Sequence, residues 1–197
     1  MTVNKNELWI IIISVHLGTL VDIMVESRTV SPETLLQIRA NDPEIHDLIM
    51  WLESFDGRPG LEELGVRLES LEIDIEALRK SIQSNPDDYC RNTLLRTDQF
   101  EIVAIIWRPG QDTPIHDHLG SDCAFLILEG ESTETIFELD ENGLAHPVSK
   151  RVYRPGEVCA ADEPDIHKVS NDANVELINL HVYTPPLHAF NIYESAI

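Results

Sequence analysis

The stretch that decides the fold reads GQDTPIHDHLGSDC at residues 110–123 and is closed by Gly130. Two apolar runs rich in β-branched and aromatic residues flank it, at residues 100–107 and 124–128. Such runs, bounded by turn residues, are typical of short β-strands. Side chains along a strand alternate between its two faces, so His116 and His118 point the same way and can hold one metal ion. The sequence therefore predicts a metal site carried by β-structure.

The spacing around these two histidines resembles the first motif of the cupin family, small β-barrels that carry a metal in the barrel mouth. After Gly110 come five residues, His-x-His, four residues, Cys123, six residues and a second glycine. The second cupin motif is matched by Arg154-Pro155-Gly156 and then by His167, which the resemblance implies as the third metal ligand. Cupins usually have a ligand glutamate at the position of Cys123, so this chain keeps three neutral histidines instead.

That replacement resembles the thiol dioxygenases, and the cysteine dioxygenase type I family in particular. Further matching motifs are Tyr89-Cys90-Arg91-Asn92 and Leu180-His181-Val182-Tyr183-Thr184-Pro185-Pro186, and the resemblance covers about Ser84 to the C-terminus. It implies a mainly β fold, a cupin barrel (double-stranded β-helix or jelly roll), with one Fe(II) per chain. Iron follows from the resemblance, because three imidazoles alone also suit Zn(II), Ni(II) or Cu(II).

The resemblance also implies a reaction and a substrate, with L-cysteine and dioxygen giving cysteine sulfinic acid. Arg91 is the candidate that binds the substrate carboxylate, because a planar guanidinium makes bidentate, charge-assisted hydrogen bonds. We expect Tyr89, in the same motif, to line the substrate site. Family members that act on cysteine have arginine at the position of Arg91, whereas those that prefer 3-mercaptopropionate have glutamine there. The alternative is a surface arginine in an ordinary salt bridge.

Three further side chains are candidates for the reaction itself. The resemblance places the Tyr183 hydroxyl near the bound thiol, and His181, two residues earlier, shares its strand face and can hydrogen-bond it. Animal cysteine dioxygenases link the equivalent tyrosine to a cysteine at the position of Cys123, so a Cys123–Tyr183 thioether is chemically possible here; the alternative, which the sequence supports equally, is that Cys123 is a buried apolar filler. The family's serine, two residues before the histidine, is replaced by Asn179.

Three other functions compete with this interpretation. The same oxidation of another small thiol, such as 3-mercaptopropionate, is the nearest alternative. A non-catalytic cupin that binds a small ligand would show no metal-dependent turnover. A zinc or nickel cupin that catalyses hydrolysis or isomerisation would need a general base near the metal, a role to which Cys123 is poorly suited.

Composition limits the partners and the compartment. The chain has 197 residues and a formal net charge of −21, with a pI near 4.5. So acidic a surface repels phosphate backbones and anionic lipids, which argues against nucleic-acid and membrane partners. Three cysteines are too few for a disulfide framework and predict a cytoplasmic protein. We expect a monomer or a weak homo-oligomer.

The chain divides into three regions within one predicted structural domain. Residues 1–30 form an N-terminal extension whose apolar run, residues 8–25, is too short and interrupted for a membrane span and predicts a buried strand or helix. Residues 31–84 have helical periodicity, with Ser31 as an N-cap before Pro32, and predict a helical cap on the barrel. Residues 85–197 form the predicted barrel. Its further strands are expected at residues 133–138, 157–160 and 175–183.

Overall fold

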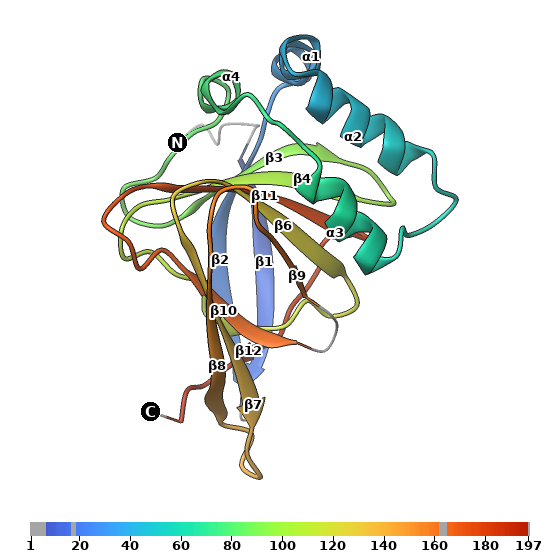
Figure 1. Ribbon diagram of the computed structural model, residues 1–197. Coiled ribbons are helices and arrows are strands. Elements are labelled where there is room, and N and C mark those ends of the chain that lie inside the picture. Colours follow the sequence, from blue (N-terminus) through green and yellow to red (C-terminus); the bar gives the residue numbers. More distant parts are fainter. Residues whose placement is uncertain (1–6, 17–18, 162–164, 197) are drawn as a thin grey trace, which may run out of the picture.

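The computed structural model describes residues 7–16, 19–161 and 165–196, and its main feature is a β-barrel with helices on one side (Figure 1). The strands are β1 (Glu7–His16), β2 (Thr19–Thr29), β3 (Cys90–Arg96), β4 (Glu101–Trp107), β5 (Ile115–His116), β6 (Asp122–Glu129), β7 (Ser132–Leu139), β8 (Ala145–Tyr153), β9 (Val158–Ala161), β10 (Ile166–Ser170), β11 (Leu177–Thr184) and β12 (Ile192–Tyr193). The helices are α1 (Pro32–Asn41), α2 (Pro43–Glu53), α3 (Leu61–Glu69) and α4 (Ile75–Arg79).

The strands form two sheets whose inner faces line one interior. The seven-stranded sheet has the order β1-β2-β3-β4-β11-β6-β9, and the five-stranded sheet has the order β12-β5-β10-β7-β8. Most neighbouring strands are antiparallel, and many of these pairs join strands that are far apart in the sequence, as in a jelly roll. The mainly β cupin barrel with an N-terminal helical cap, predicted from the sequence, is confirmed.

Strands β4 and β11 lie at the centre of the larger sheet and are buried on both faces. One face packs against the helices through Ile102, Ala104, Leu180 and neighbouring apolar residues. The opposite face of β11 points into the barrel and carries its polar residues. Burial on both faces explains the uninterrupted apolar run of β4, because neither set of alternating side chains meets water.

Helix α1 begins at the N-cap that the sequence predicted, and the four described helices end at polar residues. Ser31 caps α1 by accepting a hydrogen bond from the Thr34 N–H, and Asp42 caps α2 by accepting from Glu44 and Ile45. Helices α2 and α3 bury their apolar stripes against the larger sheet, as Figure 1 shows above β4 and β6. Because helices and sheet share one core, we propose that residues 31–84 and 85–197 fold as a single unit.

Gly130 follows β6 with a φ of 79°, in the left-handed region that favours glycine. A Cβ built at this position would collide with the carbonyl oxygen of Glu176. The glycine that closes the first cupin motif is therefore required by close backbone approach, and any side chain would push β6 away from the start of β11.

The apolar N-terminal run forms a hairpin of two strands, one of the two structures the sequence allowed. Strand β1 pairs with β2 throughout, and the end of β2 runs parallel to β3 from Ser27 to Thr29. The hairpin thus extends the larger sheet at its edge. The first six residues of the predicted extension, and residues 17–18, lie outside the described part of the chain. Within the described residues, none of the helices is long and apolar enough to cross a membrane.

Candidate active site

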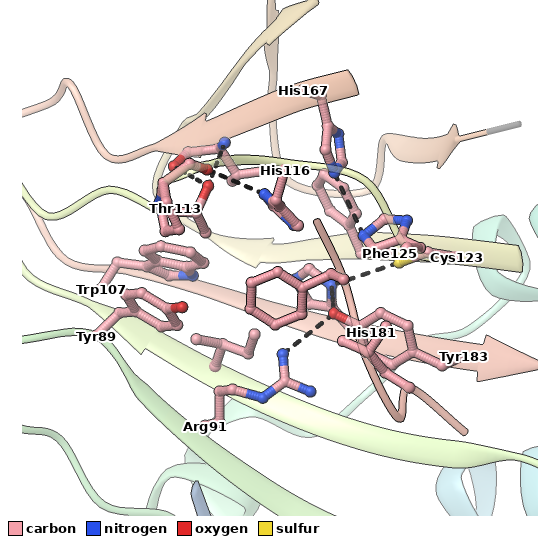
Figure 2. A pocket seen from close by; sticks show the side chains of 16 residues that line it. Tyr89, Arg91, Trp107, Thr113, His116, Cys123, Phe125, His167, His181 and Tyr183 are labelled. Atoms are coloured by element: carbon pink, nitrogen blue, oxygen red, sulfur yellow. Dashed lines mark hydrogen bonds between the residues drawn. The ribbon is translucent and has the colours of Figure 1, made fainter. Parts of the chain in front are cut away.

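One pocket in the barrel interior contains every site residue predicted from the sequence (Figure 2). These residues are Tyr89, Arg91, His116, His118, Cys123, His167, His181 and Tyr183. They come from strands β3, β5, β6, β10 and β11 and from the turns beside them, so only the folded barrel brings them together. Figure 2 shows His116 and His167 on one side of the pocket and Arg91 on the other.

The three predicted metal ligands form one buried cluster. Their ligand atoms all lie within 4.8 Å of one another, and the Nε2 atoms of His118 and His167 are 3.3 Å apart. Strand pairing produces this arrangement, because His167 of β10 lies directly opposite His116 of β5. His118 follows two residues later and returns to the same side.

Electrostatics keep the cluster ready for a cation. Burial, and next the neighbouring His167, lower the pKa of His116 to about 3. Burial and the same neighbour also hold the pKa of His118 well below its usual value. Neutral imidazoles with free lone pairs are the form that binds a metal, so these side chains need no deprotonation at neutral pH.

The outer nitrogens of two ligands are held by acceptors, which fixes their tautomers. His116 Nδ1 lies 3.0 Å from the carbonyl oxygen of Pro114, and His167 Nδ1 lies 2.8 Å from Glu134 Oε1. Both acceptors lack protons when Glu134 is ionised, so each Nδ1 carries the hydrogen and each Nε2 presents its lone pair to the cluster. Burial raises the pKa of Glu134, but hydrogen bonds from His167, Cys159 and Tyr153 outweigh it and keep the carboxylate ionised.

Asp117, between the two ligands of the His-x-His motif, points away from the pocket and ties down the C-terminal segment. Its carboxylate accepts hydrogen bonds from the backbone and side chain of Asn191 at 2.9 and 2.8 Å and from the Tyr193 hydroxyl at 2.7 Å. This tether brings Phe190 against the His116 ring, with centroids 5.3 Å apart. Sequence reasoning missed both Asp117 and Glu134.

The donor set fits a divalent transition metal. Three imidazoles from one face are compatible with iron, zinc, nickel or copper, and the barrel interior supplies the protected surroundings. Cys123 is not part of the cluster, and burial raises the pKa of its thiol to about 12. The geometry therefore matches a site with three neutral ligands and open positions beside them.

Arg91 is buried, 6% exposed, at the start of β3. Its Nη1 donates to the Tyr183 hydroxyl at 3.2 Å, whereas its Nε and Nη2 atoms have no hydrogen-bond partner among the described residues. The alternative of a surface arginine in a salt bridge is thereby wrong. A buried guanidinium with two open donors favours binding of an anion, and a carboxylate is the simplest acceptor for a pair of parallel N–H groups.

Cys123, His181 and Tyr183 lie in contact beside the cluster. Tyr183 pairs with Cys123 across β11 and β6, and the His181 Nδ1 lies 3.3 Å from the Tyr183 hydroxyl and 3.8 Å from the Cys123 sulfur. Burial raises the pKa of Tyr183, so its hydroxyl stays protonated at neutral pH. Asn179, at the family's serine position, accepts instead from Trp107 at 2.9 Å, and the Nε2 of His181 has no partner among the described residues.

Aromatic rings form part of the pocket wall around these groups. Tyr89 stacks on Trp107 with ring centroids 4.4 Å apart, and Phe125 stacks on His181 at 4.5 Å. Leu187 and Phe190 line the same pocket from the C-terminal segment. Such walls exclude water and strengthen the electrostatic interactions inside.

Known proteins similar to this chain include cysteine dioxygenases from two vertebrates. The family model described as "Cysteine dioxygenase type I" matches residues 60–196. The chain is similar to "Cysteine dioxygenase type 1" of Homo sapiens, with 30% identity over 138 residues that cover 60% of this chain and 68% of the human protein. The Danio rerio protein of the same name is 28% identical over 140 residues, covering 62% and 69%. Among solved structures, TT1209 from Thermus thermophilus aligns with 23% identity and a TM-score of 0.48, covering 55% of this chain and 94% of that one.

Proposed function

The chain belongs to the cysteine dioxygenase type I family, and we propose that it uses Fe(II) and dioxygen to oxidise L-cysteine to cysteine sulfinic acid. In this reaction the thiol and one dioxygen molecule combine without any other reactant, because both oxygen atoms pass to sulfur. His116, His118 and His167 would hold the iron. Bound ferrous iron would supply the centre at which dioxygen is activated.

The observation that carries the proposal is the buried Arg91, which lines the same pocket as the histidine cluster and has two N–H donors without a partner among the described residues. A cysteine carboxylate held there would be fixed at one end, with its thiol free to reach the cluster. Cysteamine has no carboxylate and would leave the guanidinium unpaired, which is costly in a buried site. Arginine at this position also favours cysteine over 3-mercaptopropionate, as the family pattern implies.

Tyr183 would complete the substrate pocket from the side of β11. Its hydroxyl already accepts from Arg91, so the same side chain touches the anchor and faces the reacting end. Because burial keeps this hydroxyl protonated, it can donate its hydrogen to the thiolate or to a developing oxygen charge. The aromatic wall would hold water out while this happens.

The proposal is tested by oxygen consumption of anaerobically purified, Fe(II)-loaded protein given L-cysteine, 3-mercaptopropionate and cysteamine in parallel. We expect fastest turnover of L-cysteine and little of cysteamine. Zinc-loaded protein is the matched control and should consume no oxygen, because zinc has no redox chemistry. If 3-mercaptopropionate is turned over fastest, that thiol is the substrate instead of L-cysteine. If none of the three thiols is turned over, the result favours a cupin that only binds a ligand.

Replacing Tyr183 with phenylalanine should lower kcat by about a hundred- to ten-thousandfold, the usual contribution of one positioned proton donor. We expect KM for L-cysteine to change less, because Arg91 keeps the carboxylate bound. Steady-state oxygen uptake, with iron content measured on the same samples, checks this. An unchanged kcat would show that the Tyr183 hydroxyl takes no part in the reaction.

A thioether between Cys123 and Tyr183 should appear after turnover in air, because the two side chains are neighbours across β6 and β11. Its formation joins sulfur to a ring carbon and removes two hydrogen atoms, with dioxygen as the oxidant. Intact mass spectrometry should therefore show a species lighter by two hydrogens, absent from a Cys123→Ser variant. If the mass stays unchanged after prolonged turnover, Cys123 is a buried filler.

Cytoplasmic location and a monomeric or weakly associated state are also part of the proposal. All three cysteines, Cys90, Cys123 and Cys159, are buried thiols, as a reducing compartment would keep them. The substrates would be small molecules, since a net charge of −21 repels the phosphate backbone of a nucleic acid.

A further inference from the structure

Glu134 is a buried carboxylate on β7 that joins the candidate metal cluster to two more distant side chains. One oxygen, Oε1, accepts from His167 Nδ1 at 2.8 Å. The other oxygen, Oε2, accepts from the Tyr153 hydroxyl at 3.0 Å and from the Cys159 thiol at 3.1 Å. All four residues are nearly inaccessible to solvent, with exposures of 1–6%. The hydrogen bonds that Tyr153 and Cys159 donate to Glu134 therefore alter how strongly this carboxylate binds the His167 imidazole.

This contact makes the metal ligands unequal. His116 donates its Nδ1 hydrogen to the neutral carbonyl of Pro114, whereas His167 donates to a charged carboxylate. Hydrogen bonds to an ionised acceptor are roughly twice as strong as neutral ones, and they make the imidazole a better electron donor. The negative charge that other cupins place directly on the metal through glutamate stands here one imidazole away.

Tyr153 and Cys159 weaken the effect of the Glu134 charge on His167. Tyr153 is the last residue of β8, and Cys159 lies in β9, so two strands outside the cluster hold Oε2. Each hydrogen bond they donate draws negative charge toward Oε2 and leaves Oε1 a poorer acceptor for His167. Removing either donor should strengthen the bond between Glu134 and His167, and removing the carboxylate charge should weaken it.

We propose that Tyr153 and Cys159 are positioning residues that act through Glu134 and His167 to set how tightly the metal is held and its reduction potential. The proposal rests on the metal site of the proposed function, but it does not depend on which thiol, if any, is oxidised. It assigns a role to two side chains that touch neither metal nor substrate.

The test compares the Fe(III)/Fe(II) midpoint potential of the iron-loaded protein with that of three variants, measured without thiol. Glu134→Gln should raise the potential, because a neutral amide stabilises Fe(III) less. Tyr153→Phe should lower it, because Glu134 then keeps more charge for His167. The double variant should match Glu134→Gln alone, since the tyrosine acts only through the carboxylate. A side chain with a merely structural role would not give opposite signs.

Metal affinity supplies a second readout that needs no redox chemistry. Titration of the metal-free protein with Co(II) should show binding weakened by about 10–100-fold in Glu134→Gln and not weakened in Tyr153→Phe. Cys159→Ala should follow Tyr153→Phe with a smaller shift of potential, because a thiol is the weaker donor. If Tyr153→Phe moves the potential in the same direction as Glu134→Gln, or still moves it when Glu134→Gln is already present, the proposal is wrong. Absence of thiol oxidation with these shifts intact would instead refute only the proposed function.

Discussion

Replacing His116 with alanine should abolish both iron retention and thiol-dependent oxygen consumption. Metal sites with four protein ligands bind with about 10–16 kcal/mol, so loss of one of three imidazoles should cost several kcal/mol of binding energy. The remaining pair, His118 and His167, would have to hold the ion alone. We expect iron content after gel filtration to fall close to background, and turnover to fall below detection.

The matched control for this variant is His146→Ala. His146 is half-exposed on β8, where its Nε2 lies 3.2 Å from an oxygen of Asp140, and it takes no part in the pocket. That variant should keep iron and activity at the level of the unmodified protein. Full iron content in His116→Ala, or equal losses in both variants, would contradict the assignment of the cluster as the metal site.

Replacing Arg91 with glutamine should reduce kcat/KM for L-cysteine by about a hundredfold, which corresponds to roughly 3 kcal/mol. The buried substrate carboxylate would lose a charged, two-pronged partner and would keep at most one neutral hydrogen bond. The same change should favour 3-mercaptopropionate relative to cysteine. Initial rates of oxygen uptake over a range of each thiol, in protein of known iron content, measure both effects.

Arg154→Gln controls for the loss of one positive charge from an already acidic chain. Arg154 lies on the surface and pairs with Glu131 at 3.2 Å. Its replacement should leave kinetics for both thiols unchanged, because exposed ion pairs contribute little. Unchanged cysteine kinetics in Arg91→Gln would show that the guanidinium does not bind the carboxylate.

The strands that the sequence predicted are those with a strong local signal. Strands β4, β6 and β11 are apolar because the helices cover one face and the barrel interior takes the other. Strand β8 gave no such signal: its residues between Ala145 and Tyr153 are all exposed, and its pairing with β7 defines it instead. The short strands β5 and β12 likewise exist only through their partners.

The residues of the candidate site also divide into those with a local sequence signal and those that only strand pairing brings into place. The three histidines, Arg91 and Tyr183 carry recognisable motifs, so their presence in one pocket was predictable. Glu134 was not, because it looks like any acidic strand residue until β7 pairs with β10 and brings it to His167. The bond from Trp107 to Asn179 was hidden for the same reason, since it joins strands 72 residues apart. Contacts made by long-range pairing leave no mark on local sequence.

The most direct test of thiol dioxygenase activity is to incubate the iron-loaded protein with L-cysteine under isotopically heavy dioxygen and to measure the mass of the product by mass spectrometry. We expect cysteine sulfinic acid in which both sulfur-bound oxygens carry the heavy isotope, because both come from one dioxygen molecule. A product with light oxygen from water, or cystine as the sole product, would contradict it.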